Sequence, residues 1–290
     1  MDPGRRAGEL SATPGALRIR IAAADAELAA DACWFLGATA ISESAGEGSG
    51  VVLDVGFDTG VTATAARADL QRRFSAASVD VVDVTAALDA ALDAWREHAR
   101  PIRAGERLVV WPAWLPVDAR PDDVVMLVDP SRAFGSGSHP STRLCLAALE
   151  RLVRPGRSVL DVGCGSGVLA VAAARLGGDP VVAIDVDEVA VAATAANARR
   201  NAVSVDASAM PVADVAGSFD VVMANIGAAT LEALAPDLAA RVNATGSAVL
   251  AGLLTEQCDR VIAAYTTVEL TTHGRDDESG WAALVLRKPL

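Results

Sequence analysis

Val159-Leu-Asp-Val-Gly-Cys-Gly-Ser-Gly167 is the stretch of this chain that decides its fold. An apolar run typical of a buried strand leads directly into a glycine-rich turn, and residues 169–176 then continue with helical character. A strand, a glycine turn and a helix in this order let the backbone approach a ligand at the carboxyl end of a parallel sheet. The stretch therefore predicts a site for a nucleoside-like ligand.

The chain beyond Pro155 alternates apolar strand-like runs with Ala-rich helical runs. Such alternation is typical of βαβ units that enclose a buried parallel sheet. The expected strands are 159–162, 181–185, 219–224, 248–253 and 282–287, and the expected helices are 169–176 and 189–200. We therefore predict a doubly wound, Rossmann-like α/β domain over residues 121–290.

An acidic residue follows the glycine turn at the sequence spacing expected for a ribose contact. Asp185 ends the second expected strand, 22 positions after Gly163, where its carboxylate can accept hydrogen bonds from both hydroxyls of a ribose. One alternative is a dinucleotide site, because Gly165-Ser-Gly-Val-Leu-Ala170 satisfies G-x-G-x-x-A. Against the dinucleotide site, the D-x-G-x-G-x-G motif that begins at Asp161 resembles the motif of S-adenosylmethionine enzymes. Their cofactor has an amino-acid tail and no pyrophosphate.

A second copy of the strand sequence occurs earlier in the chain. Val52-Leu-Asp-Val-Gly56 repeats the letters of residues 159–163, but Phe57 and Asp58 follow it where the second glycine should stand. Without that glycine the backbone cannot approach a ligand in the same way. We interpret the copy as chance.

The first part of the chain has the pattern of a small α+β domain. Strands are expected at 16–22, 51–55 and 78–84, helices at 25–36 and 64–74, and a break at 42–50. We therefore predict a disordered tail over 1–15, a ferredoxin-like α+β domain over 16–84, and a linker helix with an interdomain segment over 85–120.

Composition excludes several classes of protein. The net charge of −12 argues against nucleic-acid binding through phosphates, which needs clustered Lys and Arg. The apolar runs are broken well before the ~18 residues of a membrane span, and no secretion signal precedes them, so we expect a cytoplasmic protein away from membranes. Four distant cysteines, without C-x-x-C spacing, predict buried free thiols and no metal site.

A longer motif carries a resemblance to a known family. Asp129-Pro-Ser-Arg-Ala-Phe-Gly-Ser-Gly-Ser-His-Pro-Ser-Thr142 resembles the D-P-G-x-A-F-G-T-G-T-H-P-T-T segment of PrmA, the bacterial methyltransferases that modify ribosomal protein eleven of the large subunit. The glycine turn, Asp185 and Asn225-Ile226 follow at matching intervals, and residues 95–114 and 251–257 are also similar to that family. The resemblance implies S-adenosylmethionine as cofactor and a protein amine as acceptor.

The resemblance also implies the site residues. The expected cofactor contacts are Thr142, Gly163, Gly165, Gly167, Asp185, Asn225, Phe134 and His139. Residues 134–142 would close over the methionine end, and the Asn225 carbonyl would orient the acceptor amine, its catalytic role. Two alternatives remain open: Thr142 is well suited to cap a helix, and His139 to bond the backbone in a turn.

Two departures from the family pattern concern the acceptor side. Gly227 stands where the family has Leu, and serines replace threonines at positions 136, 138 and 141. We expect the substrate to be a basic ribosomal protein, presented by the N-terminal domain. Two alternatives concern the acceptor: a lysine of another protein, such as the electron-transfer flavoprotein β subunit, or a small amine. Two others concern the activity: the chain could be a nicotinamide-dependent oxidoreductase or a binding module without catalysis. Methylation of bases or of glutamine is disfavoured, since Asn225-Ile-Gly-Ala replaces N-P-P-[YF].

Overall fold

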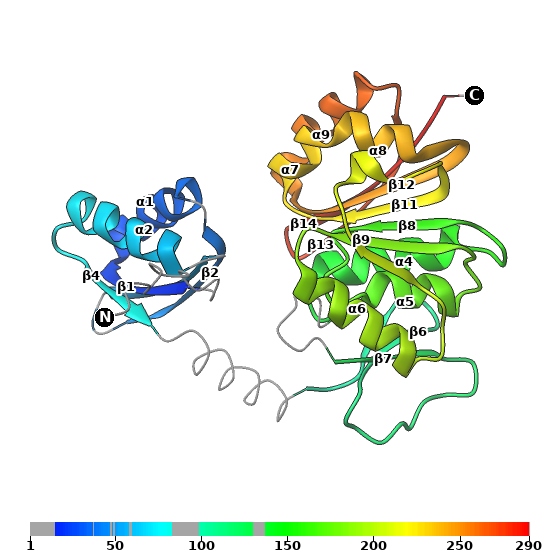
Figure 1. The fold of residues 1–290 in the computed structure, drawn as a ribbon, viewed down its shortest axis with the longest axis horizontal. Helices are drawn as coiled ribbons and strands as arrows, with labels where there is room; N and C mark the ends of the chain where they lie inside the picture. The colour runs from blue at the N-terminus through cyan, green and yellow to red at the C-terminus, as the bar shows by residue number, and fades with distance from the viewer. Residues whose placement is uncertain are drawn as a thin grey trace, which may run out of the picture. The chain divides into compact units, whose positions relative to one another are not determined.

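The computed structural model describes residues 15–36, 38–46, 48, 50–57, 60–82, 99–129 and 137–289. The chain divides into two compact units, Met1–Glu97 and His98–Leu290 (Figure 1). Three sequence-based expectations lie outside the described residues: the tail up to residue 14, the helix over 85–98, and the placement of Phe134.

The first unit is a four-stranded sheet with two helices. Its described elements are β1 (Gly15–Ala22), α1 (Ala23–Phe35), β2 (Ala38–Ala45), β3 (Gly50–Phe57), α2 (Gly60–Arg73) and β4 (Ser78–Val82). The strand order is β2-β3-β1-β4, and all neighbouring strands are antiparallel. This is the split βαβ arrangement of ferredoxin-like domains. Alternate residues such as Leu17 and Leu53 pack under Ala29 and Leu70 of the helices.

Strand β2 is a difference from the sequence-based expectation. Its polar second half was expected to break the pattern from Ser42 onward, yet the strand continues to Ala45. Ser42 pairs with Asp54 and Ala45 with Val51, so the neighbouring strand supplies the backbone hydrogen bonds. Pairing with a neighbour therefore overrides the weak strand preference of these residues.

The second unit begins with a small three-stranded sheet. Its strands are β5 (Ile102–Ala104), β6 (Leu108–Pro112) and β7 (Val124–Val128), in the order β5-β6-β7. Every residue of β6 is buried. The Pro- and Trp-containing stretch 100–115, part of the interdomain segment expected over 85–120, was interpreted as a linker, and this was wrong for β6, where Trp111 and Pro112 are buried.

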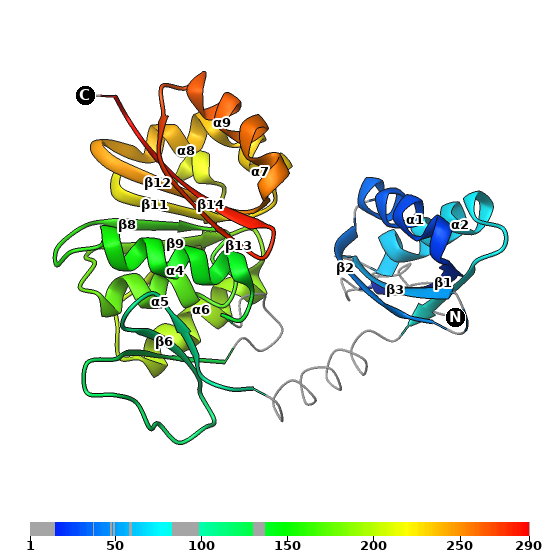
Figure 2. The same ribbon diagram turned by 180° about the vertical axis from the view of Figure 1, so that it is seen from behind.

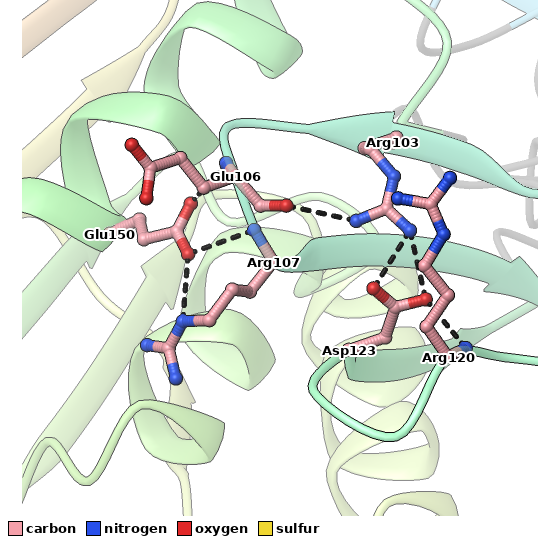
Figure 3. A network of polar contacts seen from close by, with 6 residues as sticks. All are labelled: Arg103, Glu106, Arg107, Arg120, Asp123 and Glu150. Atoms are coloured by element: carbon pink, nitrogen blue, oxygen red, sulfur yellow. Dashed lines mark hydrogen bonds and ion pairs between the residues drawn. The ribbon is translucent and has the colours of Figure 1, made fainter.

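Charged side chains hold the ends of this small sheet, as Figure 3 shows. Glu150 accepts hydrogen bonds from the backbone N–H groups of Glu106 and Arg107, at 2.7 and 3.0 Å. Asp123 accepts two bonds from the Arg103 guanidinium, at 2.7 and 2.8 Å. The Glu150 bonds attach the β5–β6 turn to helix α4 (Pro140–Leu152), the helix that carries Glu150, and the Asp123 bonds hold β5 to the residue before β7.

The main sheet has seven strands. After α4 follow β8 (Val159–Val162), α5 (Val168–Arg175), β9 (Val181–Asp185), α6 (Glu188–Arg200), β10 (Asp206–Ala209), β11 (Phe219–Asn225), α7 (Ala228–Ala233), α8 (Ala235–Arg241), β12 (Val242–Leu254), α9 (Cys258–Thr266), β13 (Thr271–Glu278) and β14 (Trp281–Arg287). The order is β10-β9-β8-β11-β12-β14-β13, with β14 antiparallel to both of its neighbours.

Helices cover both faces of this sheet, which confirms the predicted doubly wound fold. Helices α4, α5 and α6 lie on one face and α7, α8 and α9 on the other, in both views (Figures 1 and 2). Alternate residues of one strand point to opposite faces of the sheet. Val159 packs in the core on the side of α4 and α5, and Leu160 and Val162 pack in the core on the side of α7, α8 and α9. The four cysteines are buried and free, as expected.

The two edge strands of the main sheet were not predicted. Strand β10 reads Asp-Ala-Ser-Ala, and β13 reads Thr-Thr-His-Gly-Arg-Asp-Asp-Glu. Edge strands are often polar, because charged side chains discourage pairing with another chain. A search for apolar runs therefore overlooks them.

Candidate functional site

The glycine turn lies at the carboxyl end of β8 and is held by the end of β9. Gly163 and Cys164 both donate backbone hydrogen bonds to the Ile184 carbonyl, at 2.9 and 3.0 Å. Gly163 has a φ of 74°, and a Cβ there would lie 2.5 Å from Cγ2 of Ile226. Both the backbone angle and the close approach require glycine.

Asp185 is joined to this turn by its side chain. Its Oδ2 accepts a hydrogen bond from the Gly165 N–H at 3.0 Å, and its Oδ1 accepts one from the Asp187 N–H at 3.1 Å. A carboxylate oxygen has room for a further hydrogen bond. The carboxylate is therefore fixed in position while it remains able to accept from a ligand.

Asn225 and Thr142 meet at the same edge of the sheet. Asn225 is the last residue of β11, and its Nδ2 donates to Thr142 Oγ1 at 3.3 Å. Thr142 lies in the first turn of α4 and is 1% exposed. The helix cap is His139, so the suggestion that Thr142 itself caps a helix was wrong.

A cavity of about 360 Å³ lies against these groups. Five of the expected site residues line it: Thr142, Gly163, Gly165, Asp185 and Asn225. The others in its wall are mostly apolar: Val162, Cys164, Val168, Leu169, Ile184, Val186, Met210, Pro211, Val212, Ile226, Thr230 and Leu234. The site thus combines a largely apolar wall with a few fixed polar groups, as small-molecule sites generally do.

Two expected residues lie elsewhere. Gly167 is outside the cavity wall, and a Cβ there would lie 2.7 Å from Thr194 Oγ1, so this glycine permits close packing against α6. His139 is also outside the wall. Its Nδ1 accepts from the Ser141 N–H at 3.3 Å, and its ring lies edge-on to Trp281 with centroids 4.4 Å apart. Burial and the nearby Arg143 lower the pKa of His139.

Several parts of the cavity wall were not predicted from the sequence, among them two that directly follow strands. Met210, Pro211 and Val212 follow the unrecognised strand β10, whose carboxyl end lies at the same sheet edge as those of β8 and β9. Val186 directly follows Asp185 and is 90% exposed. The rule that ligands bind beyond the carboxyl ends of parallel strands would have found both, once β10 had been recognised.

Buried ionisable groups lie just beneath the glycine turn. Asp161 is 1% exposed, and burial raises its pKa to about 7. The Ala170 N–H, which donates to Asp161 Oδ2 at 3.1 Å, lowers this pKa, and the nearby Asp185 raises it. Among the described residues, Oδ1 of Asp161 has no hydrogen-bond partner. Burial raises the pKa of Cys164 to about 12, so this thiol stays protonated and is a poor nucleophile.

Neither a metal-ligand cluster nor a membrane-spanning helix occurs in the part of the chain that the structure describes. No three His, Cys, Asp or Glu side chains there come together in a way that would hold a metal ion. None of its helices combines the length and the apolar character needed to cross a bilayer.

Known proteins resemble this chain over most of the second unit. The family model described as ribosomal protein L11 methyltransferase (PrmA) matches residues 90–289. A protein named ribosomal protein L11 methyltransferase from Geobacter sulfurreducens is 47% identical over 193 residues, which are 67% of this chain and 64% of that protein. One of the same name from Cupriavidus necator is 48% identical over 185 residues, 63% of this chain and 60% of that protein.

A solved structure extends this similarity to three dimensions. The crystal structure of a ribosomal protein L11 methylase from Lactobacillus delbrueckii subsp. bulgaricus is 30% identical, with a TM-score of 0.62, over 66% of this chain and 100% of the solved chain. The aligned stretch spans less than two thirds of the length of the two named relatives. The match of the family model to more than half of the chain, together with these relatives, shows that the chain belongs to the ribosomal protein L11 methyltransferase (PrmA) family.

Proposed function

We propose that this chain is an S-adenosylmethionine-dependent methyltransferase that modifies lysine and N-terminal amines of a large-subunit ribosomal protein. One observation carries the proposal. In a chain of this family, Thr142, Gly163, Asp185 and Asn225 come from separate parts of the sequence and line one cavity at the carboxyl ends of the sheet.

The residues around the cavity fit this cofactor. Gly163 presents only backbone to the cavity, and the fixed carboxylate of Asp185 suits the hydroxyls of a ribose. The apolar residues around Val186 and Met210 suit a flat base. When bound, S-adenosylmethionine supplies a methyl group already activated by its positive sulfur.

The nicotinamide alternative is less compatible with this fold. Dinucleotide-binding sheets have the order 3-2-1-4-5-6, whereas here the antiparallel strand β14 stands between β12 and β13.

The chain's own task is then to orient and desolvate the acceptor amine. A lysine ammonium must lose a proton before it can attack, and entry into an apolar cavity lowers its pKa. The side-chain carbonyl of Asn225 is proposed to accept a hydrogen bond from the neutral amine and to direct its lone pair. Holding the amine in line with the methyl group supplies the largest part of the rate increase.

The acceptor is proposed to be a basic protein. The net charge of −12 favours encounter with a basic partner such as a ribosomal protein and disfavours direct binding to nucleic acid. We further propose that residues 16–84 present this partner to the catalytic domain, and that the reaction takes place in the cytoplasm, where ribosomes assemble.

Two measurements test the proposal. Thermal shift with S-adenosylhomocysteine and with NAD identifies the ligand, since only a ligand of the folded state stabilises it. Intact mass of purified ribosomal protein L11, after reaction with S-adenosylmethionine, should increase by whole methyl groups. Electron-transfer flavoprotein β subunit and small amines serve as alternative acceptors. Stabilisation by NAD alone, or modification of an alternative acceptor alone, would overturn the proposal.

A further inference from the structure

Helix α6 carries three buried polar side chains on one face. Thr194 and Asn197 are 0% exposed and Asn201 is 7% exposed, at spacings of three and four residues. These spacings place the three side chains on one side of a helix that is otherwise rich in alanine. Buried polar groups cost free energy unless they are hydrogen-bonded, so their partners show what they do.

Asn201 pairs with the edge of β7. Its Oδ1 accepts from the Leu127 N–H at 2.8 Å, and its Nδ2 donates to the Leu127 carbonyl at 2.7 Å. The side-chain amide thus takes the place of a neighbouring strand. A further bond from Nδ2 returns to the backbone of α6, at the Asn197 carbonyl, over 2.8 Å.

Asn197 makes the same pair of bonds with Asp129, two residues after Leu127 in the chain. Its Oδ1 accepts from the Asp129 N–H, and its Nδ2 donates to the Asp129 carbonyl, both at 3.0 Å. In addition, Nδ2 donates to the Ser166 carbonyl at 2.8 Å. Asn197 therefore joins the end of β7 to the glycine turn, whereas the hydrogen bonds of Asn201 described above go to Leu127 and to the backbone of α6.

Thr194 holds the neighbouring peptide of the same turn. Its hydroxyl lies 3.1 Å from the Gly165 carbonyl and 3.2 Å from Cys164 Sγ, as a donor to either. Helix α6 thus holds two successive carbonyls of the turn, and Asp185 holds the Gly165 N–H from the other side. Glycines have wide conformational freedom, so contacts from outside the turn add to the order that its own Gly167 N–H to Cys164 carbonyl bond gives it.

We propose that Thr194 and Asn197 are positioning residues that set the affinity of the glycine turn for its nucleoside cofactor, whereas Asn201 holds the edge of β7 and the end of α6. The inference rests on the proposed function, because it concerns the ligand of the same cavity. A turn already held in its binding conformation loses less freedom when the ligand binds, which strengthens binding. Neither side chain lines the cavity, so both act through the backbone.

The two asparagines provide a matched pair of variants. Asn197→Asp and Asn201→Asp each keep one acceptor and remove the donor to a β7-segment carbonyl, so both should lower the melting temperature. Asn197→Asp alone removes the donor to Ser166. We expect it to raise the Kd for S-adenosylhomocysteine about tenfold, as loss of a bond of ~1.4 kcal/mol would. The Kd of Asn201→Asp for S-adenosylhomocysteine should stay within about twofold of that of the unaltered chain, because substitutions that do not touch the turn change binding only slightly.

Thr194 supplies a second, isosteric test that preserves packing. Thr194→Val removes the hydroxyl and should raise the Kd for S-adenosylhomocysteine about fivefold, whereas Thr194→Ser keeps the hydroxyl and should restore affinity. Both Thr194→Val and Asn197→Asp should raise the KM for S-adenosylmethionine while kcat is retained. If Asn197→Asp fails to fold, the Val and Ser variants decide alone.

The outcomes separate this inference from the proposed function. Calorimetry that finds no binding of S-adenosylhomocysteine to the unaltered chain overturns the function itself. Unaltered affinity in Thr194→Val, or equal weakening in Asn197→Asp and Asn201→Asp, overturns the positioning role while the function stands.

Discussion

Asn225 donates a hydrogen bond from Nδ2 to Thr142 Oγ1 at 3.3 Å, across 83 residues of sequence. The bond connects the end of β11 to the first turn of α4, directly at the cavity. It orients the amide group whose carbonyl is proposed to direct the acceptor amine.

Removing either end of this bond should therefore reduce turnover. Thr142→Val keeps the shape of the buried side chain and frees the amide to rotate, so kcat should fall about tenfold, the equivalent of one hydrogen bond. Thr142→Ser should keep most of the activity. Asn225→Ala should lower kcat further. Full turnover by Asn225→Ala, with cofactor binding intact in calorimetry, would contradict the role of Asn225.

Asp185 should dominate cofactor affinity. Asp185→Asn replaces a charged acceptor by a neutral amide, and hydrogen bonds to charged groups contribute about 1.5–3 kcal/mol, so the Kd for S-adenosylhomocysteine should rise at least about tenfold. Asp187→Asn is the matched control. Asp187 caps α6 by accepting from the Val189 N–H at 2.8 Å, and Asn caps a helix equally well. Equal affinities of the two variants would count against a ribose contact at Asp185.

The two copies of Val-Leu-Asp-Val-Gly allow a test within one chain. Gly163→Ala forces a side chain into a φ of 74° and against Ile226, so it should weaken S-adenosylhomocysteine binding more than tenfold and lower stability by about 1–2 kcal/mol or more. Gly56→Ala lies within β3, paired with Ala16 and Ala40, and should leave binding unchanged. Calorimetry and thermal unfolding of both variants check this, and weakened binding in Gly56→Ala would be unexpected.

Asp161 should make the stability of the protein depend on pH. Burial raises its pKa from 3.8 to about 7, so between these values the folded state holds a proton that the unfolded state has released. Stability from this group is fully present below about pH 4 and falls as pH rises to about 7, by at most ~1.4 kcal/mol per pH unit. Asp161→Asn cannot ionise and should lack this fall.

Urea unfolding of both proteins at about pH 5 and about pH 7 measures the effect. The variant should gain stability relative to the unaltered chain as pH rises, because the cost of burying a charge is removed. Other titrating groups cancel in this comparison. A constant difference between the two proteins at both pH values would show that Asp161 does not titrate in this range.

Much of the fold was predictable because its signals are local. The buried parallel strands β8, β9 and β11 are mostly apolar runs, and the glycine turn and Asp185 stand at the ends of β8 and β9. The edge strands β10 and β13 were missed because their side chains are polar and their structure depends on a neighbouring strand. The buried strand β6 was missed because Pro and Trp in its region suggested a linker.

The repeated pentapeptide separates local from tertiary control. In both copies the letters favour a strand, and both are strands. Yet Asp54 is half-buried and forms an ion pair with Arg18 at 2.6 Å, whereas Asp161 is fully buried beneath the glycine turn. The letters are identical, so the neighbours brought by the rest of the chain decide whether each carboxyl group is paired or buried alone.

By itself, then, the sequence determined the glycine turn, the acidic strand end and the family, because each is a short motif whose chemistry is carried by adjacent residues. Only the tertiary structure decided that Thr142 lies against Asn225, that Met210 joins the cavity, and that Asn197 holds the turn from behind. These contacts depend on the order in which distant strands and helices pack. That order follows from the burial of whole faces and cannot be read from any single stretch.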